Sequence, residues 1–340
     1  MIKNSAIAGI WVGIVLVLLG CGGVVANQAL ETKRLDELQF FGSHNSYKRP
    51  IPPAVMAQLE QVNPELAAGL EYWHEPLADQ LDLGVRVFEF DVFFDPTQQL
   101  FKRHSAFPVL HIQTIDTASL CATLEQCFEQ LLAWTAKHPR HEPILVSFNA
   151  KDARIDRPGF VVPAAFSEQA FVQLDERLTQ LLGERALTPT EVLRAGAPDR
   201  PVQWPVLSEA RGKFLLLLDE SGEKRDRYLA ANATPVMFAN LPATDPRAAI
   251  MVLNDPIGQA DEICVLSRAG YLVRTRADAD TVEARANSTL RRDAAFNSGA
   301  VFVSTDYYLP ARHFNSDYQV TLPGGGAVRF NPGRNRLGCR

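Results

Sequence analysis

The stretch that decides the fold is residues 40–47, FFGSHNSY, taken together with residues 83–95, LGVRVFEFDVFFD. The first places His44 directly after an apolar run, and the second places Glu89 and Asp91 two positions apart in a strand-like segment. Because residues i and i+2 of a strand share one face, the two carboxylates should lie on the same side. Two like charges on an apolar strand need positive charge between them, and a hard cation such as Ca²⁺, which takes oxygen ligands, is the natural candidate.

Length and charge limit the classes of protein that fit. With 340 residues and a hydrophobic fraction of 46%, the chain can bury one large α/β barrel or two smaller domains. The net charge is −5, and the run of Arg291 with Arg292 is too short to form a basic patch. Phosphate backbones need a basic surface, so we expect no nucleic-acid partner, and we expect a monomer.

The N-terminus predicts export. Lys3 precedes an apolar run over residues 6–19, which is the length of a signal sequence and short for a membrane span. The run ends in LLGC, which resembles the bacterial lipobox, so residues 1–20 should be a lipoprotein signal peptide with Cys21 as the lipidated residue. Residues 21–34 are then a tether and residues 35–340 the folded unit. An ordinary signal peptide or an N-terminal anchor remains open, and all three alternatives place the protein in the cell envelope or outside the cell.

Export also makes disulfides possible. Cys121 and Cys127 flank Thr123 and Gln126, which fit a helix-capping box with Thr123 as the N-cap. The helix would then begin after Cys121, which could fold back over the first turn and bond to Cys127. Cys264 and Cys339 are the remaining pair.

The pattern of the chain predicts a single-domain α/β fold of the (β/α)₈ barrel type. Strand-like runs lie at 38–41, 85–93, 108–112, 143–148, 213–218, 236–241, 271–276 and 300–305, most of them followed by helical sequence. Polar residues gather at the carboxyl ends of these runs, the face where such barrels carry their sites. A doubly wound open sheet is the alternative, but its glycine fingerprint is absent from the sequence.

His44 and His111, each at the end of a predicted strand, suit general acid–base chemistry on a phosphodiester. One histidine would remove a proton from the attacking hydroxyl and the other would protonate the leaving oxygen. A cation held by Glu89, Asp91 and amide oxygens would stabilise the charge that develops on the phosphate.

Five segments in register, GSHNSY, LGVRVFEFDVFFD, PVLHI, LVRTRADAD and VSTDYY, resemble the calcium-dependent phosphatidylinositol-specific phospholipase C family, within the superfamily of phospholipase C-like phosphodiesterases. The resemblance runs from about residue 38 to residue 332. It implies a distorted or incomplete barrel, one Ca²⁺ ion and cleavage of the glycerophosphate bond of a phospholipid. In that reaction the inositol 2-hydroxyl attacks phosphorus and diacylglycerol is released.

The resemblance also implies roles for particular residues. His44 matches the general base and His111 the general acid, and the calcium ligands correspond to Asn45, Glu89, Asp91 and Asn149. The family usually has glutamate in an ETKD-like stretch where this chain has Asn149, in NAKD. The substitution removes one negative charge and predicts weaker calcium binding.

Four further residues are candidates for substrate contacts. Arg274 and Arg276 share one strand face and could hold phosphate through paired hydrogen bonds. Asp306 and Tyr308 could contact the sugar ring.

Other assignments stay open. Glu89 and Asp91 could instead pair with Arg86 or Arg103, and His104 is a rival to His111 as the acid. The whole chain could be a glycerophosphodiester phosphodiesterase, or a non-catalytic surface barrel that binds phosphorylated sugars or lipid headgroups. Both enzyme hypotheses require the two histidines and the two carboxylates to converge at one place.

Overall fold

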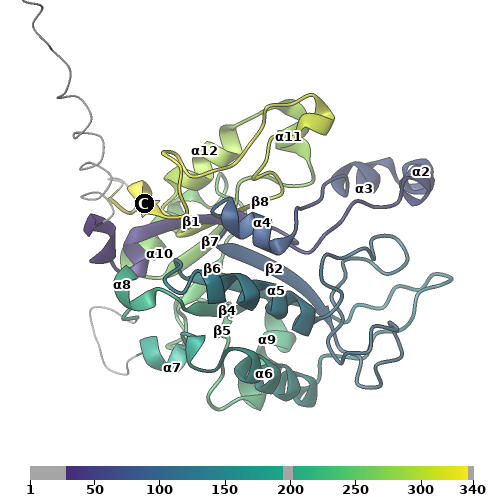
Figure 1. The fold of residues 1–340 in the computed structure, drawn as a ribbon, viewed down its shortest axis with the longest axis horizontal. Coiled ribbons are helices and arrows are strands. Elements are labelled where there is room, and N and C mark those ends of the chain that lie inside the picture. The colour runs from purple at the N-terminus through teal and green to yellow at the C-terminus, as the bar shows by residue number, and fades with distance from the viewer. Residues whose placement is uncertain (1–27, 194–201, 336–340) are drawn as a thin grey trace, which may run out of the picture.

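The computed structural model describes residues 28–193 and 202–335, and these form a nearly closed barrel of eight parallel strands with helices between them (Figure 1). The strand order is β5-β4-β3-β2-β1-β8-β7-β6. The strands are β1 (Leu38–Ser43), β2 (Val87–Phe93), β3 (Ile144–Lys151), β4 (Phe214–Leu218), β5 (Phe238–Ala239), β6 (Ile250–Val252), β7 (Leu272–Arg276) and β8 (Phe302–Thr305). The predicted single-domain α/β barrel is confirmed. The predicted signal peptide, Cys21 and Cys339 lie outside the described residues.

The barrel is incomplete at one place. Strands β5 and β6 stand at the two ends of the strand order and share no ladder, so a seam runs between them. A short ninth strand, β9 (Arg329–Phe330), pairs antiparallel with the start of β1.

One strand prediction was wrong and one strand was missed. Residues 108–112 are not a barrel strand; they lie in a long loop and make only isolated antiparallel bridges, Val92 to Val109 and Pro108 to Thr123. A short apolar run looks the same in sequence whether it is a strand or a buried loop, and Val109 is fully buried. β2 pairs directly with β3, and the strand that brings the number to eight is β6, beside β7, whose three residues are too few to show a period.

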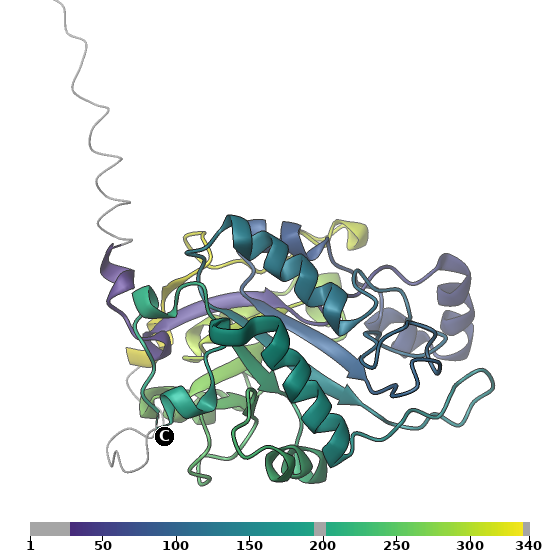
Figure 2. The ribbon, with the colours of Figure 1, turned by 60° about the horizontal axis from the view of Figure 1, so that its bottom comes forward.

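Helices surround the barrel. They are α2 (Pro53–Val62), α3 (Pro64–Gly69), α4 (Leu77–Asp82), α5 (Leu124–Lys137), α6 (Glu168–Leu182), α7 (Pro189–Val192), α8 (Leu207–Ala210), α9 (Gly222–Ala231), α10 (Ala260–Ala269), α11 (Val282–Ala286) and α12 (Leu290–Asn297), with short 3₁₀ turns at Leu35–Glu37, Gly183–Arg185, Arg312–Phe314 and Pro332–Asn335. Figure 2 shows α5 and α6 along the outside of the strands, and α2 and α3 project away from the barrel in Figure 1. None of the helices in the described part of the chain is long and apolar enough to cross a bilayer.

The start of α5 is built as its sequence predicts. The Thr123 side chain accepts a hydrogen bond from the Gln126 amide at 3.3 Å and so caps the helix. Cys121 folds back over this turn and forms a disulfide with Cys127, with 5.0 Å between the Cα atoms. Cys264 is also disulfide-bonded.

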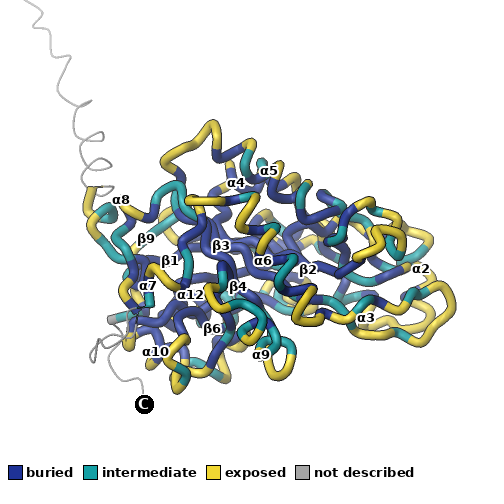
Figure 3. Tube along the Cα trace, turned by 90° about the horizontal axis from the view of Figure 1, so that it is seen from below, coloured by how far each residue is buried: buried dark blue, intermediate teal, exposed yellow. Residues whose placement is uncertain are grey.

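Successive side chains of the strands point alternately out of and into the barrel, and they join two different hydrophobic clusters. On β2 and β3, Phe90 and Phe148 face outward and contact Phe128 of α5. The alternate residues, among them Val87 and Leu145, join a second core cluster inside the barrel. Figure 3 shows the buried strands wrapped by elements whose outer faces are exposed.

Candidate active site

The interior of the barrel changes from apolar to polar toward the carboxyl ends of the strands. Following the inward face of β2 and β3 beyond Val87 and Leu145 gives two pairs of neighbours: Glu89 beside Ser147, and Asp91 beside Asn149. The same alternation brings in His44 after β1, Asp219 after β4, Arg274 and Arg276 on β7, and Asp306 after β8. This polar layer is where barrel enzymes carry their chemistry.

Close pairing of β1 and β2 depends on Gly42. A Cβ atom at this position would clash with the carbonyl oxygen of Val87, so a side chain there would push the two strands apart. The next inward position of β1 is His44, and its Nε2 lies 3.6 Å from Oε1 of Glu89. The absence of a side chain at Gly42 lets β1 lie close to β2, and this brings His44 near Glu89.

His44 is held in one orientation by a carboxylate. Its Nδ1 lies 2.8 Å from Oδ1 of Asp306, and its Nε2 lies 3.3 Å from Nη1 of Arg276. Because the guanidinium can only donate, Nδ1 carries the proton and Nε2 presents its lone pair to the site. Burial, together with the charge of Arg276, keeps the pKa of His44 well below 6.5, so the ring is neutral at neutral pH.

His111 is held in the same way although it comes from a loop. Its Nδ1 lies 2.9 Å from Oδ2 of Asp116, which is buried and lies 3.2 Å from the ammonium group of Lys48. The Nε2 atom of His111 lies 3.4 Å from the amide nitrogen of Asn45, the neighbour of His44. Two carboxylate-oriented histidines thus meet in one place. The rival, His104, lines a separate pocket on the outside with Arg103 and Glu125.

The two carboxylates of β2 are already paired. Asn149 donates its amide nitrogen to Glu89 Oε1 at 2.8 Å and to Asp91 Oδ1 at 3.1 Å. The other oxygen of Glu89 forms an ion pair with Arg274, and Oδ2 of Asp91 lies 3.1 Å from the ammonium of Lys151. The partners are therefore neither Arg86 nor Arg103, the pairs that the sequence left open; Arg86 pairs with Glu142 at the other end of the barrel.

This arrangement decides how well a calcium ion fits. The four predicted ligands offer oxygen donors of the kind that Ca²⁺ prefers. However, Asn149 turns its nitrogen to the carboxylates, and Asn45 donates its nitrogen to the Tyr72 hydroxyl at 2.8 Å. Within residues 28–193 and 202–335, no three or more His, Cys, Asp or Glu side chains are grouped so as to hold a metal. The residues as arranged do not fit calcium, and we derive no step through it.

The four predicted substrate contacts have mixed surroundings. Arg274 is only 2% exposed, and besides Glu89 it donates to Asn254 at 2.7 Å. Arg276 lies between His44 and Asp306, with Nη2 3.1 Å from Oδ2 of Asp306. The carboxylate of Asp306 thus serves His44 and Arg276. Tyr308 accepts a hydrogen bond from the Glu75 amide and stacks on His74.

Sequence reasoning missed several residues of the site. Asp116 follows His111 by five positions, and a carboxylate so near a candidate acid was the available signal. Asp278 is fully buried, accepts hydrogen bonds from Thr305 and from the Asp306 amide, and has its pKa raised to about 7 by burial and by the charge of Asp306. It supports the loop that carries Asp306.

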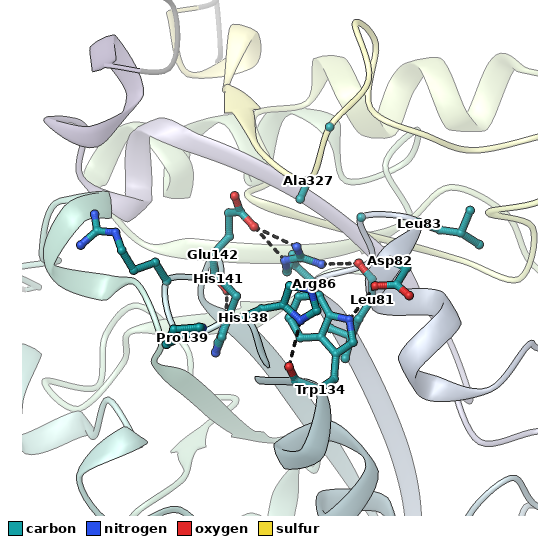
Figure 4. Close-up of a pocket in the computed structure, with 13 residues that line it drawn as sticks. Leu81, Asp82, Leu83, Arg86, Trp134, His138, Pro139, His141, Glu142 and Ala327 are labelled. Carbon is teal, nitrogen blue, oxygen red and sulfur yellow. Dashed lines mark hydrogen bonds and ion pairs between the residues drawn. The ribbon is translucent and has the colours of Figure 1, made fainter. Parts of the chain in front are cut away.

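One cavity lies apart from this centre and another reaches its edge. A cavity of about 690 Å³, shown in Figure 4, is lined by Trp134, His138 and Glu142 near the amino ends of β2 and β3, the opposite end from the histidines. A smaller one of about 200 Å³ reaches Asp306 and is bordered by Trp73 and Tyr308. Because barrel enzymes carry their sites at the opposite face, we assign no catalytic role to the cavity at the amino ends of the strands.

The polar layer with its two carboxylate-oriented histidines lies at the carboxyl ends of the parallel strands, the face where barrel enzymes carry their sites. Residues 33–332 match the family model described as "Phosphoinositide phospholipase C, Ca2+-dependent". The chain belongs to this family. A search of curated proteins gave no match.

Two solved structures have a similar fold. One is the calcium-dependent phosphoinositol-specific phospholipase C from the Gram-negative bacterium Pseudomonas sp., in its apo form (crystal form 2): 16% identity, a TM-score of 0.56, and coverage of 89% of this chain and 96% of that one. The other is the Ca²⁺-dependent phosphatidylinositol-specific phospholipase C from Streptomyces antibioticus: 17% identity, a TM-score of 0.55, and coverage of 88% and 99%. At 16% and 17% sequence identity, these comparisons show that the proteins share a fold.

Proposed function

We propose that this protein is a phosphodiesterase that cleaves the glycerophosphate bond of phosphatidylinositol or a related phospholipid, with His44 as general base and His111 as general acid. Family membership supports the reaction class. The observation that carries the assignment of roles is the pair of histidines, each with Nδ1 on a buried carboxylate and each with Nε2 facing the polar layer. Such orientation fixes the tautomer that acid–base catalysis needs.

The proposed step moves one proton at each histidine. Nε2 of His44 takes the proton of the inositol 2-hydroxyl, and the oxygen attacks phosphorus. The bond from phosphorus to the glycerol oxygen breaks, and Nε2 of His111 donates a proton to that oxygen, which releases diacylglycerol. Arg276 lies 3.3 Å from Nε2 of His44 and would stabilise the charge that builds on the phosphate oxygens.

Calcium enters this proposal only through the family, because the residues as arranged do not fit the ion. The family is described as Ca²⁺-dependent, and Asn45, Glu89, Asp91 and Asn149 are the residues that would supply oxygen donors. We also propose that the protein is exported, that the tether attaches to the membrane surface through Cys21, and that the protein is a monomer; together these describe a cell-envelope enzyme.

The test is product analysis with phosphatidylinositol vesicles. We expect diacylglycerol and a cyclic inositol phosphate, and we expect His44→Ala and His111→Ala each to lower kcat by about 10²- to 10⁴-fold while the protein stays folded. Hydrolysis of deacylated glycerophosphodiesters in preference to the intact lipid would favour the glycerophosphodiesterase alternative. Binding of vesicles without any product, in protein whose fold is verified, would favour the non-catalytic alternative.

A further inference from the structure

The two carboxylates on the inner face of β2 are matched by two cations of the chain itself. Arg274 pairs with Glu89, and Lys151 pairs with Asp91. The carboxylates are nearly inaccessible, with side chains 4% and 2% exposed. Each of these two carboxylates thus already has a positive partner from the chain, where a divalent cation would otherwise supply the positive charge.

We propose that Arg274 and Lys151 take the place of the calcium ion, so that the site neither binds nor requires Ca²⁺. This rests on the proposed phosphodiesterase function. The protons and bonds of the reaction are those given above and need no additional reactant.

Contacts with several residues hold the side chain of Arg274 beside Glu89. Its side chain is buried, one nitrogen donates to Asn254 at 2.7 Å, and the carboxylate of Asp219 lies 3.7 Å away. These contacts come from β7, the residues after β6 and the end of β4, so the guanidinium is held from several strands at once. A calcium ion would have to displace a side chain that the barrel holds in position, next to Glu89.

The uncharged side chain of Asn149 is consistent with this arrangement of ion pairs. A glutamate here, as the family resemblance would have it, would add a carboxylate beside Glu89 and Asp91 without adding a cation, and a divalent ion could then be attracted. The amide instead donates to both Glu89 and Asp91. The neutral residue therefore adds no negative charge to the two ion pairs.

The two cations suit different tasks. Arg274 is buried, whereas the Lys151 side chain is 35% exposed and can follow a ligand at the rim. With Arg276 nearby, the chain supplies fixed positive charge for the developing charge on phosphate without a metal.

The first experiment compares turnover of phosphatidylinositol vesicles by the full-length protein in millimolar Ca²⁺ and in excess chelator, after removal of bound metal. We expect rates equal to within about twofold. A loss of tenfold or more (about 1.4 kcal/mol) in chelator, reversed by added Ca²⁺, would overturn the proposal.

The second experiment measures Ca²⁺ binding directly by calorimetry without substrate. Wild type should give no binding heat at millimolar Ca²⁺, whereas Lys151→Met and Arg274→Gln, which each free a carboxylate, should bind. Lys224→Met is the matched control: Lys224 of α9 donates to the Ala150 carbonyl near the end of β3 but pairs with Asp152 at 2.9 Å, so its loss should leave the site without affinity. Thermal unfolding shows whether Arg274→Gln is folded; if it is not, Lys151→Met and wild type decide.

The two experiments separate this proposal from the proposed function. Calcium binding by wild type overturns the proposal whether or not the protein is active. Absence of turnover in every condition, with no binding of Ca²⁺ by wild type but binding by Lys151→Met, supports the charge replacement and counts against the phosphodiesterase function.

Discussion

Asp306 holds the ring of His44 in one orientation, and we expect the loss of this carboxylate to lower turnover. In Asp306→Asn the amide can present either its nitrogen or its oxygen to Nδ1, so the proton of the ring is no longer fixed away from the site. We expect kcat to fall by about 10²- to 10⁴-fold with a smaller change in KM. Steady-state kinetics with phosphatidylinositol vesicles measures the split between the two constants.

Asp226→Asn serves as the control because that carboxylate is 63% exposed and pairs with its neighbour Arg225, away from His44. Normal kcat in Asp306→Asn would show that His44 does not depend on this contact.

Arg276 predicts a pH effect with a definite sign. Burial and the charge of Arg276 lower the pKa of His44 below 6.5, so the base stays neutral and activity should persist at mildly acidic pH. Arg276→Gln removes a positive charge and should raise the pKa of His44, which moves the acidic limb of kcat/KM to higher pH. A limb that stays at the same pH in Arg276→Gln would mean that another group controls it.

Sequence alone predicted the individual groups of the site better than their pairings. His44, His111, Glu89 and Asp91 stand in short segments with recognisable patterns, and the structure brings them together. The pairing of Arg274 with Glu89 joins residues 185 positions apart, and local periodicity carries no information about which strands face one another across a barrel.

At the scale of elements, the disulfide that closes the start of α5 should stabilise the fold. The bridge spans a separation of 6 residues, and chain-entropy arguments give about 2 kcal/mol for so short a loop. Cys121→Ala and Cys127→Ala should therefore each lower the free energy of unfolding by about that amount, with an added cavity cost in the core. Denaturant titration measures it.

The double variant is the control, since the cross-link can be lost only once and its contribution should not add. Equal stability of the wild type with and without reductant would show that the bridge contributes nothing.

Elements with a strong local signal were predictable and short ones were not. The capped helix α5 and the buried strands β3 and β4 follow from capping residues and continuous apolar runs. Residues 108–112 were misassigned and β6 was missed, because three to five apolar residues fit both a strand and a buried loop.

At the scale of the whole molecule, export makes a prediction for Cys21. If the LLGC sequence directs lipidation, the wild-type protein should fractionate with membranes and Cys21→Ala should not be lipid-anchored. Cell fractionation with immunodetection, supported by mass measurement of the mature N-terminus, tests this. An unmodified Cys21 in wild type would leave an ordinary signal peptide or a protein anchor as the alternatives.

The seam between β5 and β6 implies that the order of the chain can be changed. Opening the backbone in the exposed turn at residues 242–244 would interrupt no strand ladder, and the antiparallel pairing of Leu38 with Phe330 brings the two ends of the barrel sequence together. A circular permutant that starts at Thr244, with residues 335 and 28 joined by a flexible linker, should therefore refold with wild-type secondary structure and retain its turnover; circular dichroism and the vesicle assay would show it. In such a permutant β6 would be synthesised first and β5 last. Strands β6 to β8 would then be made before β1 to β5, which is the opposite of the natural order.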